Sequence, residues 1–227
     1  MLKSKKPVFW EALIVTIVIF LAGLFLGMLV ESNNSNKIAN LYLQSEISLN
    51  DASAAFNIME NTKINCEAIK EENIKMADRV YEEAKLLELY ENSGKITDSM
   101  KLLHKKYDLL RAILWESNKE PLDRCGNYNL IVYLYEYETE DTNRKVVQKV
   151  WSKILLDAKR KNPDILLLPI AGNQNLTTIE YLIEEYQIKQ LPALVINNEK
   201  VLYEIFDSET AAMALGFQAL AAARAAA

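Results

Sequence analysis

Two cysteines and one histidine are the side chains of this 227-residue chain that could carry redox or metal chemistry. Cys66 and Cys125 do not form a Cys-x-x-Cys pair, and neither lies at zinc-ligand spacing from His104. The sequence contains no phosphate-binding glycine loop, no Gly-x-Ser-x-Gly and no His-Glu-x-x-His. We therefore predict no catalytic residue, no metal site and no cofactor.

A long segment without helix breakers positions the histidine and the first cysteine. Residues 37–118 contain no proline and one glycine, Gly94, which predicts a mostly helical region. Apolar residues recur at helical spacing in two stripes: Cys66, Ile69, Met76, Val80 and Leu87, and then Met100, Leu103, Tyr107, Leu110 and Leu114. The polar stretch 91–95 separates them. The pattern predicts an antiparallel coiled-coil hairpin of about 55–91 against 96–117. It belongs to a helical region over 31–120, in which a stalk helix, about 38–49, precedes the hairpin.

This hairpin predicts how the two cysteines are related in space. Folding the chain about Ser93 places Cys66 opposite the residues just before Cys125, which follows the helix end expected at Pro121. Outside a reducing compartment two neighbouring thiols oxidise, so we predict a Cys66–Cys125 disulfide bond with a structural role. Two buried free thiols are the alternative.

An apolar segment near the N-terminus can anchor the chain in a lipid bilayer. Residues 8–30 carry one charge, Glu11. At about 1.5 Å per residue, such a helix spans a hydrocarbon layer of about 30 Å. Phe9 and Trp10 lie where interfacial aromatic residues occur. We predict a single transmembrane helix over 8–30, with a cleaved signal peptide as the alternative.

The charges that flank this segment predict its orientation. Lys3, Lys5 and Lys6 precede it, and no basic residue follows before Lys37. The positive-inside rule assigns residues 1–7 to a cytoplasmic tail and the rest of the chain to the extracytoplasmic side of the cell membrane. Gly23 and Gly27 form a small-xxx-small pair, which either faces lipid or lets two copies of the helix associate as a homo-oligomer.

The pattern changes at Asn129 to alternating strands and helices, which predicts an α/β domain over 125–227. Four strands are expected, at 130–137, 164–172, 193–196 and 201–205. Helices are expected at 143–161, at 177–187 and from about Ser208 into an alanine-rich end. The first of these helices should turn one face inward, made of Val147, Val150, Trp151, Ile154 and Leu155. Thr177 or Thr178 should cap the second.

The order β-α-β-α-β-β-α resembles the thioredoxin fold over residues 130–205. The most specific part is Tyr186-x-Ile188, followed by Leu191-Pro192 and the hairpin ALVINNEKV. The whole layout also resembles membrane-anchored archaeal thioredoxin-like proteins. The resemblance implies a cis peptide bond at Leu191–Pro192. It also implies a contact surface at these two residues, because relatives that bind without reacting hold peptides there.

The resemblance also locates a degenerate active site. In thioredoxins the Cys-x-x-Cys follows the first of these strands, and Thr139, Glu140, Asp141 and Thr142 occupy that position here. A threonine hydroxyl forms no disulfide and is a poor nucleophile without a neighbouring base. The position retains a structural use, because Asp141, Thr142 or Asn143 can cap the next helix.

Two further surface features arise from the sequence. Glu136, Glu138, Glu140 and Asp141 cluster with Tyr135 and Tyr137, and they form either an acidic docking surface or a solvated strand end. Asn33 and Asn175 each begin an Asn-x-Ser/Thr sequon. Both lie on the predicted outer side of the membrane, where glycosylation is permitted.

Together these features favour a membrane-anchored, extracytoplasmic accessory subunit that binds another protein. A membrane complex such as an oligosaccharyltransferase is a precedent by fold analogy alone. The alternatives are an envelope thiol–disulfide oxidoreductase that uses Cys66 and Cys125, and a homo-oligomeric structural stalk. The net charge of −5 argues against a nucleic-acid partner.

Overall fold

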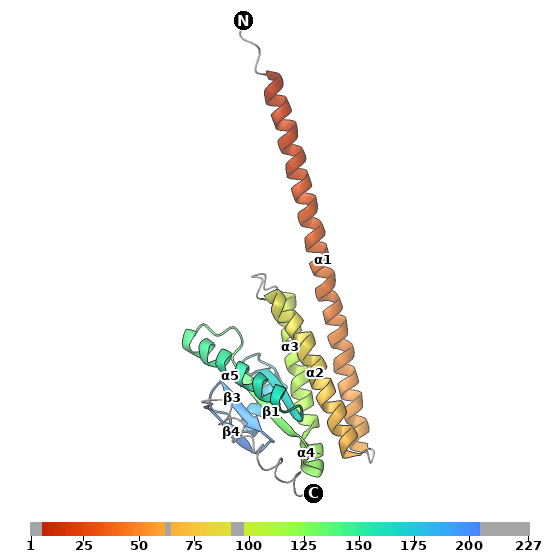
Figure 1. The fold of residues 1–227 in the computed structure, drawn as a ribbon, viewed down its shortest axis with the longest axis vertical. Helices are drawn as coiled ribbons and strands as arrows, with labels where there is room; N and C mark the ends of the chain where they lie inside the picture. Colours follow the sequence, from red (N-terminus) through yellow and green to blue (C-terminus); the bar gives the residue numbers. More distant parts are fainter. Residues whose placement is uncertain (1–5, 62–64, 92–97, 205–227) are drawn as a thin grey trace. The chain divides into compact units, whose positions relative to one another are not determined.

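The protein is mostly helical and contains one small mixed sheet (Figure 1). A computed structural model describes residues 6–61, 65–91 and 98–204. Its elements are α1 (Lys6–Asn61), α2 (Cys66–Glu91), α3 (Asp98–Ser117), α4 (Lys119–Cys125), β1 (Asn129–Tyr135), α5 (Thr142–Lys161), β2 (Ile165–Ala171), α6 (Thr177–Glu185), β3 (Ala193–Ile196) and β4 (Lys200–Leu202). The chain divides into two compact units, Met1–Gln44 and Ser45–Ala227, and each is considered by itself.

The first unit consists of the N-terminal part of α1. Within the described ranges, Phe9–Val30 is the stretch long and apolar enough to cross a membrane, with a mean hydropathy of 2.9. Its large apolar side chains are exposed, as a lipid-facing helix requires. A Cβ atom added to Gly23 or Gly27 would meet no atom within 4 Å, so the backbone is open to close approach at both positions.

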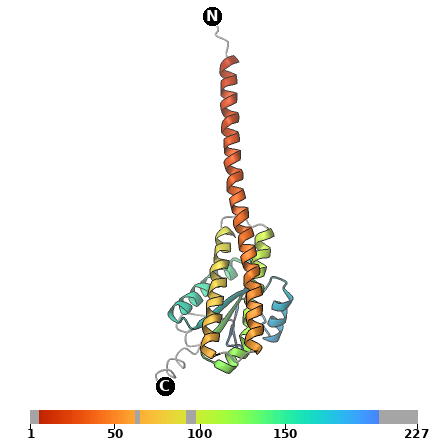
Figure 2. The same ribbon diagram turned by 90° about the vertical axis from the view of Figure 1, so that its right-hand side faces the viewer.

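The second unit begins inside α1, which continues without a break to Asn61. The prediction that the hairpin starts near residue 55 is therefore wrong, because 55–61 belong to α1 and the next helix begins at Cys66. The C-terminal part of α1 runs beside α2 and α3 (Figure 2). Ser48 Oγ donates to Glu83 Oε1 over 3.4 Å, and Lys106 pairs with Glu46. The end of α1 thus packs against the hairpin, whereas the sequence predicted a stalk that ends near residue 49.

The predicted seam of the hairpin is buried. Its five residues are each at most 2% exposed: Met100, Leu103, Tyr107, Leu110 and Leu114. After Ser117 the short helix α4 follows, with Pro121 in its first turn. Proline is tolerated in the first turn because its missing N–H would have no helical partner there, so Pro121 does not end a helix as predicted.

The sheet has the strand order β2-β1-β3-β4. β1 is parallel to β2 and antiparallel to β3, and β3 is antiparallel to β4. Residues 197–199 connect β3 to β4, and the N–H of Glu199 donates to the carbonyl of Ile196 over 3.0 Å. Asn197 and Asn198 have φ angles of 50° and 59°, a left-handed conformation that asparagine tolerates.

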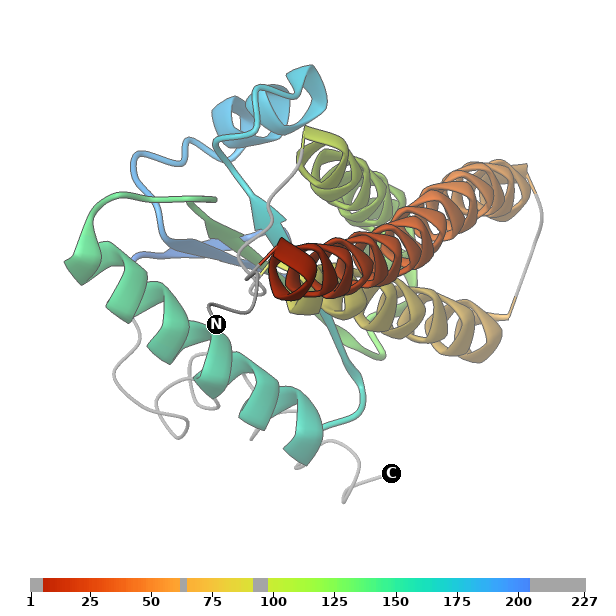
Figure 3. The ribbon, with the colours of Figure 1, turned by 90° about the horizontal axis from the view of Figure 1, so that it is seen from above.

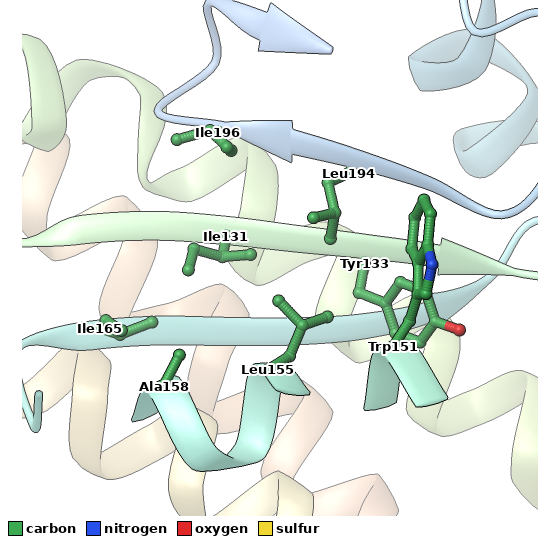
Figure 4. Close-up of a cluster of buried hydrophobic side chains, with 8 residues drawn as sticks. All are labelled: Ile131, Tyr133, Trp151, Leu155, Ala158, Ile165, Leu194 and Ile196. Carbon is green, nitrogen blue, oxygen red and sulfur yellow. The ribbon is translucent and has the colours of Figure 1, made fainter. Parts of the chain in front are cut away.

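Helices cover both faces of the sheet. Figure 3 shows α5 on one side of the strands and the α2–α3 pair on the other. Under α5 lies a core of Ile131, Tyr133, Trp151, Leu155, Ala158, Ile165, Leu194 and Ile196 (Figure 4). Val147 and Val150 are 42% and 50% exposed, contrary to the prediction that they face inward. The buried residues of α5 begin at Trp151.

Some predicted features fall outside the described residues. They are the helix expected from about Ser208, the alanine-rich end and Gly94.

Candidate functional site

The strand topology brings three chain segments together at one edge of the sheet. The parallel strands β1 and β2 both end there, at Tyr135 and Ala171, which are paired. The antiparallel strand β3 begins at the same edge, with Ala193 opposite Leu134. One residue further back, the register sets Pro192 beside Tyr135, and the Leu191–Pro192 peptide bond is cis.

The degenerate position after β1 is used to start α5. Thr139 is 8% exposed, and its Oγ1 accepts the backbone N–H of Asp141 over 3.3 Å. Asp141 is the N-cap, as one of the sequence alternatives predicted, and it accepts the N–H groups of Asn143 and Arg144. Hydroxyl and carboxylate oxygens thus satisfy the free N–H groups of the first turn.

Two side-chain amides fix the loop that leads from β1 to this helix. Gln148 bonds both backbone groups of Glu136, accepting from its N–H over 2.8 Å and donating to its carbonyl over 3.0 Å. Asn173 bonds Tyr137 in the same paired way, at 2.8 and 2.9 Å. The backbone of the loop is therefore held by side chains of α5 and of the segment after β2.

The acidic cluster predicted here is largely engaged in other contacts. Glu136 pairs with Arg144, and Glu138 lies 2.9 Å from Lys101 Nζ. Asp141 serves as the helix cap, while Glu140 is exposed. These ion pairs compensate much of the negative charge, so the structure gives little support to an acidic docking surface at this edge.

A buried carboxylate beside the site was missed by the sequence analysis. Asp108 is fully buried on α3, and its Oδ1 accepts the N–H of Ala171 over 3.1 Å and lies 3.3 Å from Arg111 Nη1. Burial raises the pKa of Asp108, while His104 and Arg111 oppose that rise. The spacings of Asp108 to His104 and Arg111, four and three residues on one helix, were the available sequence signal.

His104 lies at the same edge, between two tyrosines and this carboxylate. Its Nε2 is 2.9 Å from Tyr135 Oη and 3.5 Å from Asp108 Oδ2, and its ring centroid is 4.0 Å from that of Tyr137. A catalytic triad uses one imidazole nitrogen for the nucleophile and the other for the orienting carboxylate. Here Tyr135 Oη and Asp108 Oδ2 both lie closest to Nε2 of His104. Among the described residues, no group of three His, Cys, Asp or Glu side chains could hold a metal ion.

The disulfide bond lies away from this edge. It joins Cys66, at the start of α2, to Cys125, at the end of α4, with 5.5 Å between their Cα atoms. α4 leads into the first residue of β1, whereas Pro192 lies beside the last. A seven-residue strand of about 20 Å separates the two ends.

Gly172 brings the cis-proline loop close to the end of β2. Its N–H donates to the carbonyl of Tyr135 over 2.8 Å. A Cβ atom at Gly172 would lie 3.0 Å from Leu191 Cδ1 and 3.2 Å from Cδ2, so the leucine packs directly on the glycine. The position of Leu191 thus depends on the missing side chain at residue 172.

Replacing Gly172 by alanine should lower the free energy of unfolding by about 1 kcal/mol, because Leu191 must move to admit the methyl group. Gly172→Val should cost more. Urea unfolding followed by tryptophan fluorescence in detergent measures the change. Leu191→Ala provides the control, because the methyl group at residue 172 should cost little once the leucine is shortened. An equal cost of Gly172→Ala with leucine and with alanine at 191 would contradict the packing argument.

Comparisons with known proteins give no assignment: no protein-family model matches the chain, and neither does any curated protein or solved structure searched.

Proposed function

We propose that the chain is a single-pass membrane protein with a redox-inactive, thioredoxin-like domain on the extracytoplasmic side. This domain binds another protein at the edge formed by Leu191 and Pro192. The chain acts as an accessory subunit of a membrane complex, of which an oligosaccharyltransferase is one example by analogy.

The architecture supports the thioredoxin-like part of the proposal. The resemblance implies a β-α-β-α-β-β order and a cis bond before the third strand. The part of the second unit from β1 to β4 has that element order. Its strands are arranged β2-β1-β3-β4, and the Leu191–Pro192 bond is cis. The helix α5 follows β1 at the position where a Cys-x-x-Cys would stand.

One observation carries the non-redox part of the proposal. The segment that follows β1 at this edge carries threonine and carboxylate side chains and no sulfur, whereas the two thiols of the chain are bonded to each other at the far end of β1. Disulfide exchange requires a sulfur atom within bonding reach of the bound substrate. A peptide held at Pro192 would meet none, so binding without reaction is the use that this edge supports.

A preformed surface favours protein binding at this edge. Gln148 and Asn173 fix the loop after β1, and Gly172 fixes Leu191. Leu191 and Pro192 are partly exposed and Gln190 is exposed, so a partner can reach them. A surface that is rigid before binding loses little conformational entropy on association.

Site-specific photocrosslinking tests the proposed contact surface. A photoreactive residue at Gln190 of the full-length protein in native membranes should give a discrete adduct. The same residue at Lys75, exposed on α2, should not give it. Adducts that are identical at the two positions, or absent at Gln190, would overturn the assignment.

Insulin reduction distinguishes the oxidoreductase alternative. The full-length protein should show no turnover with dithiothreitol as the reductant beyond the rate of dithiothreitol alone. Turnover that disappears in Cys125→Ser would replace the binding proposal with thiol–disulfide exchange. Analytical ultracentrifugation in detergent would show whether a second copy is the partner.

A further inference from the structure

The two sequons differ in backbone conformation. Asn33 lies three residues beyond Val30, and residues 33–35 are helical within α1. A helical backbone has its N–H and C=O groups committed along the axis, so this segment cannot bend into an enzyme cleft without unfolding a turn. A position this close to the candidate membrane span also leaves little room for a membrane-bound enzyme.

Asn175 is itself exposed and lies in the segment between β2 and α6. Its φ angle is 53°, a left-handed conformation that asparagine tolerates. Leu176 is extended, with φ of −106° and ψ of 119°, and Thr177 is the exposed first residue of α6. Asn175 and Leu176 thus lie outside regular secondary structure, so the Asn175 amide can enter a transferase site without the unfolding of a helical turn at that residue.

The Asn175 side chain is also chemically available. No hydrogen bond engages its amide within the described part of the chain, whereas the oxygen and the nitrogen of the Asn173 amide, two residues earlier, both bond to the backbone of Tyr137. The N-cap of α6 is Leu176, with no side-chain capping bond, so neither Thr177 nor Thr178 takes the capping role predicted for them. Modification at Asn175 would therefore break no contact seen in the structure.

We propose that Asn175 accepts an N-linked glycan and that Asn33 does not. The proposal rests on the proposed extracytoplasmic placement of the domain. The donor is a glycan carried on a polyprenyl phosphate. The amide nitrogen bonds to the anomeric carbon of the sugar, the carbon–oxygen bond to the phosphate breaks, and the lipid phosphate leaves with the bonding electrons. The amide proton passes to a base on the transferase.

The glycan would stand beside the proposed contact surface. Asn175 is three residues from Gly172, whose backbone packs against Leu191, so at most about 11 Å of chain separates the two positions. A sugar chain there would exclude a partner from the side of the β2–α6 segment. It would direct binding at Leu191 and Pro192 to the opposite side.

Translation of the full-length chain with endoplasmic-reticulum microsomes tests acceptor competence. We expect one glycosidase-sensitive gel shift, lost in Asn175→Asp and retained in Asn33→Gln. Aspartate tolerates the left-handed backbone at 175, so this variant preserves the turn. Thr177→Ser should retain the shift and Thr177→Val should lose it, which ties the shift to the hydroxyl.

A reporter variant separates failure of this inference from failure of the proposed orientation. Gly94→Thr creates a new Asn-Ser-Thr sequon that begins at Asn92, and it should add one shift if the second unit enters the microsomal lumen. A shifted reporter without modification at Asn175 would overturn the acceptor assignment alone. An unshifted reporter and an unshifted native chain would overturn the extracytoplasmic placement. A shift lost only in Asn33→Gln would reverse the choice between the sequons.

Discussion

Replacing Cys66 and Cys125 together by alanine should lower the free energy of unfolding by about 4 kcal/mol. The bond joins residues with a sequence separation of 59, and in the chain-entropy model closing such a loop restricts the unfolded state by about this amount. For a chain of this size, the midpoint of thermal unfolding should fall by about 10 °C. Circular dichroism in detergent measures the shift.

Reduction provides the control for this prediction. Dithiothreitol should lower the unfolding midpoint of the native protein to that of the double variant and should leave the double variant unchanged. Ser99→Ala, an exposed change on α3, should alter the stability by less than about 0.5 kcal/mol. If the native and doubly substituted proteins melted together under oxidising conditions, the bond would not carry the stability assigned to it.

The cysteine pairing could be predicted because it depends on the turn and not on the helix boundaries. The hairpin was expected to begin near 55, but α2 begins at Cys66 itself. The fold about Ser93 nevertheless placed the two thiols together, since pairing across an antiparallel hairpin follows from distance to the turn. The seam from Met100 to Leu114 followed from periodicity for a similar local reason.

Burial on α5 could not be predicted because periodicity gives the direction of a face but not the extent of what covers it. Val147 and Val150 belong to the predicted apolar face, yet both are exposed and the buried residues of the helix begin at Trp151. The continuity of α1 was missed for a different reason. The sequence has no helix breaker between 49 and 61, so no residue supported the predicted interruption between 49 and 55.

The edge of the sheet was predicted in its backbone features but not in its charges. The helix cap at Asp141 follows from the local preference of aspartate for this position. The ion pair of Glu138 with Lys101 joins residues from different elements, so no local pattern reveals it. The hydrogen bond from the N–H of Ala171 to Asp108 joins residues that are 63 positions apart in the chain, so no local pattern reveals it either.

Replacing Asp108 by alanine should cost about 3 kcal/mol of stability. The change would leave the side chain of Arg111, 7% exposed, without its carboxylate and the N–H of Ala171 without its acceptor. Asp157→Ala is a matched control, because it also breaks a pair three residues apart, with Arg160, at the surface. That control should cost less than about 1 kcal/mol. Similar losses in both variants would remove the special role of burial at Asp108.

Asp108→Asn separates the charge of this residue from its hydrogen bond, because the amide oxygen can still accept from Ala171. Burial raises the pKa of Asp108, so the folded state holds this proton up to a higher pH than the unfolded state, where the pKa is about 3.9. Between these two pKa values the folded state binds more protons. The contribution of Asp108 to the free energy of unfolding therefore falls as pH rises through this interval.

The stability of the native protein relative to Asp108→Asn should consequently increase as pH is lowered from 7 toward 4. Asparagine does not titrate, and the other ionisable groups are common to both proteins, so their contributions largely cancel in the difference. Urea unfolding of the two proteins at a series of pH values measures it. A difference that is constant with pH, or one that decreases toward acid, would mean that the attraction of Arg111 and His104 outweighs the burial of the carboxylate.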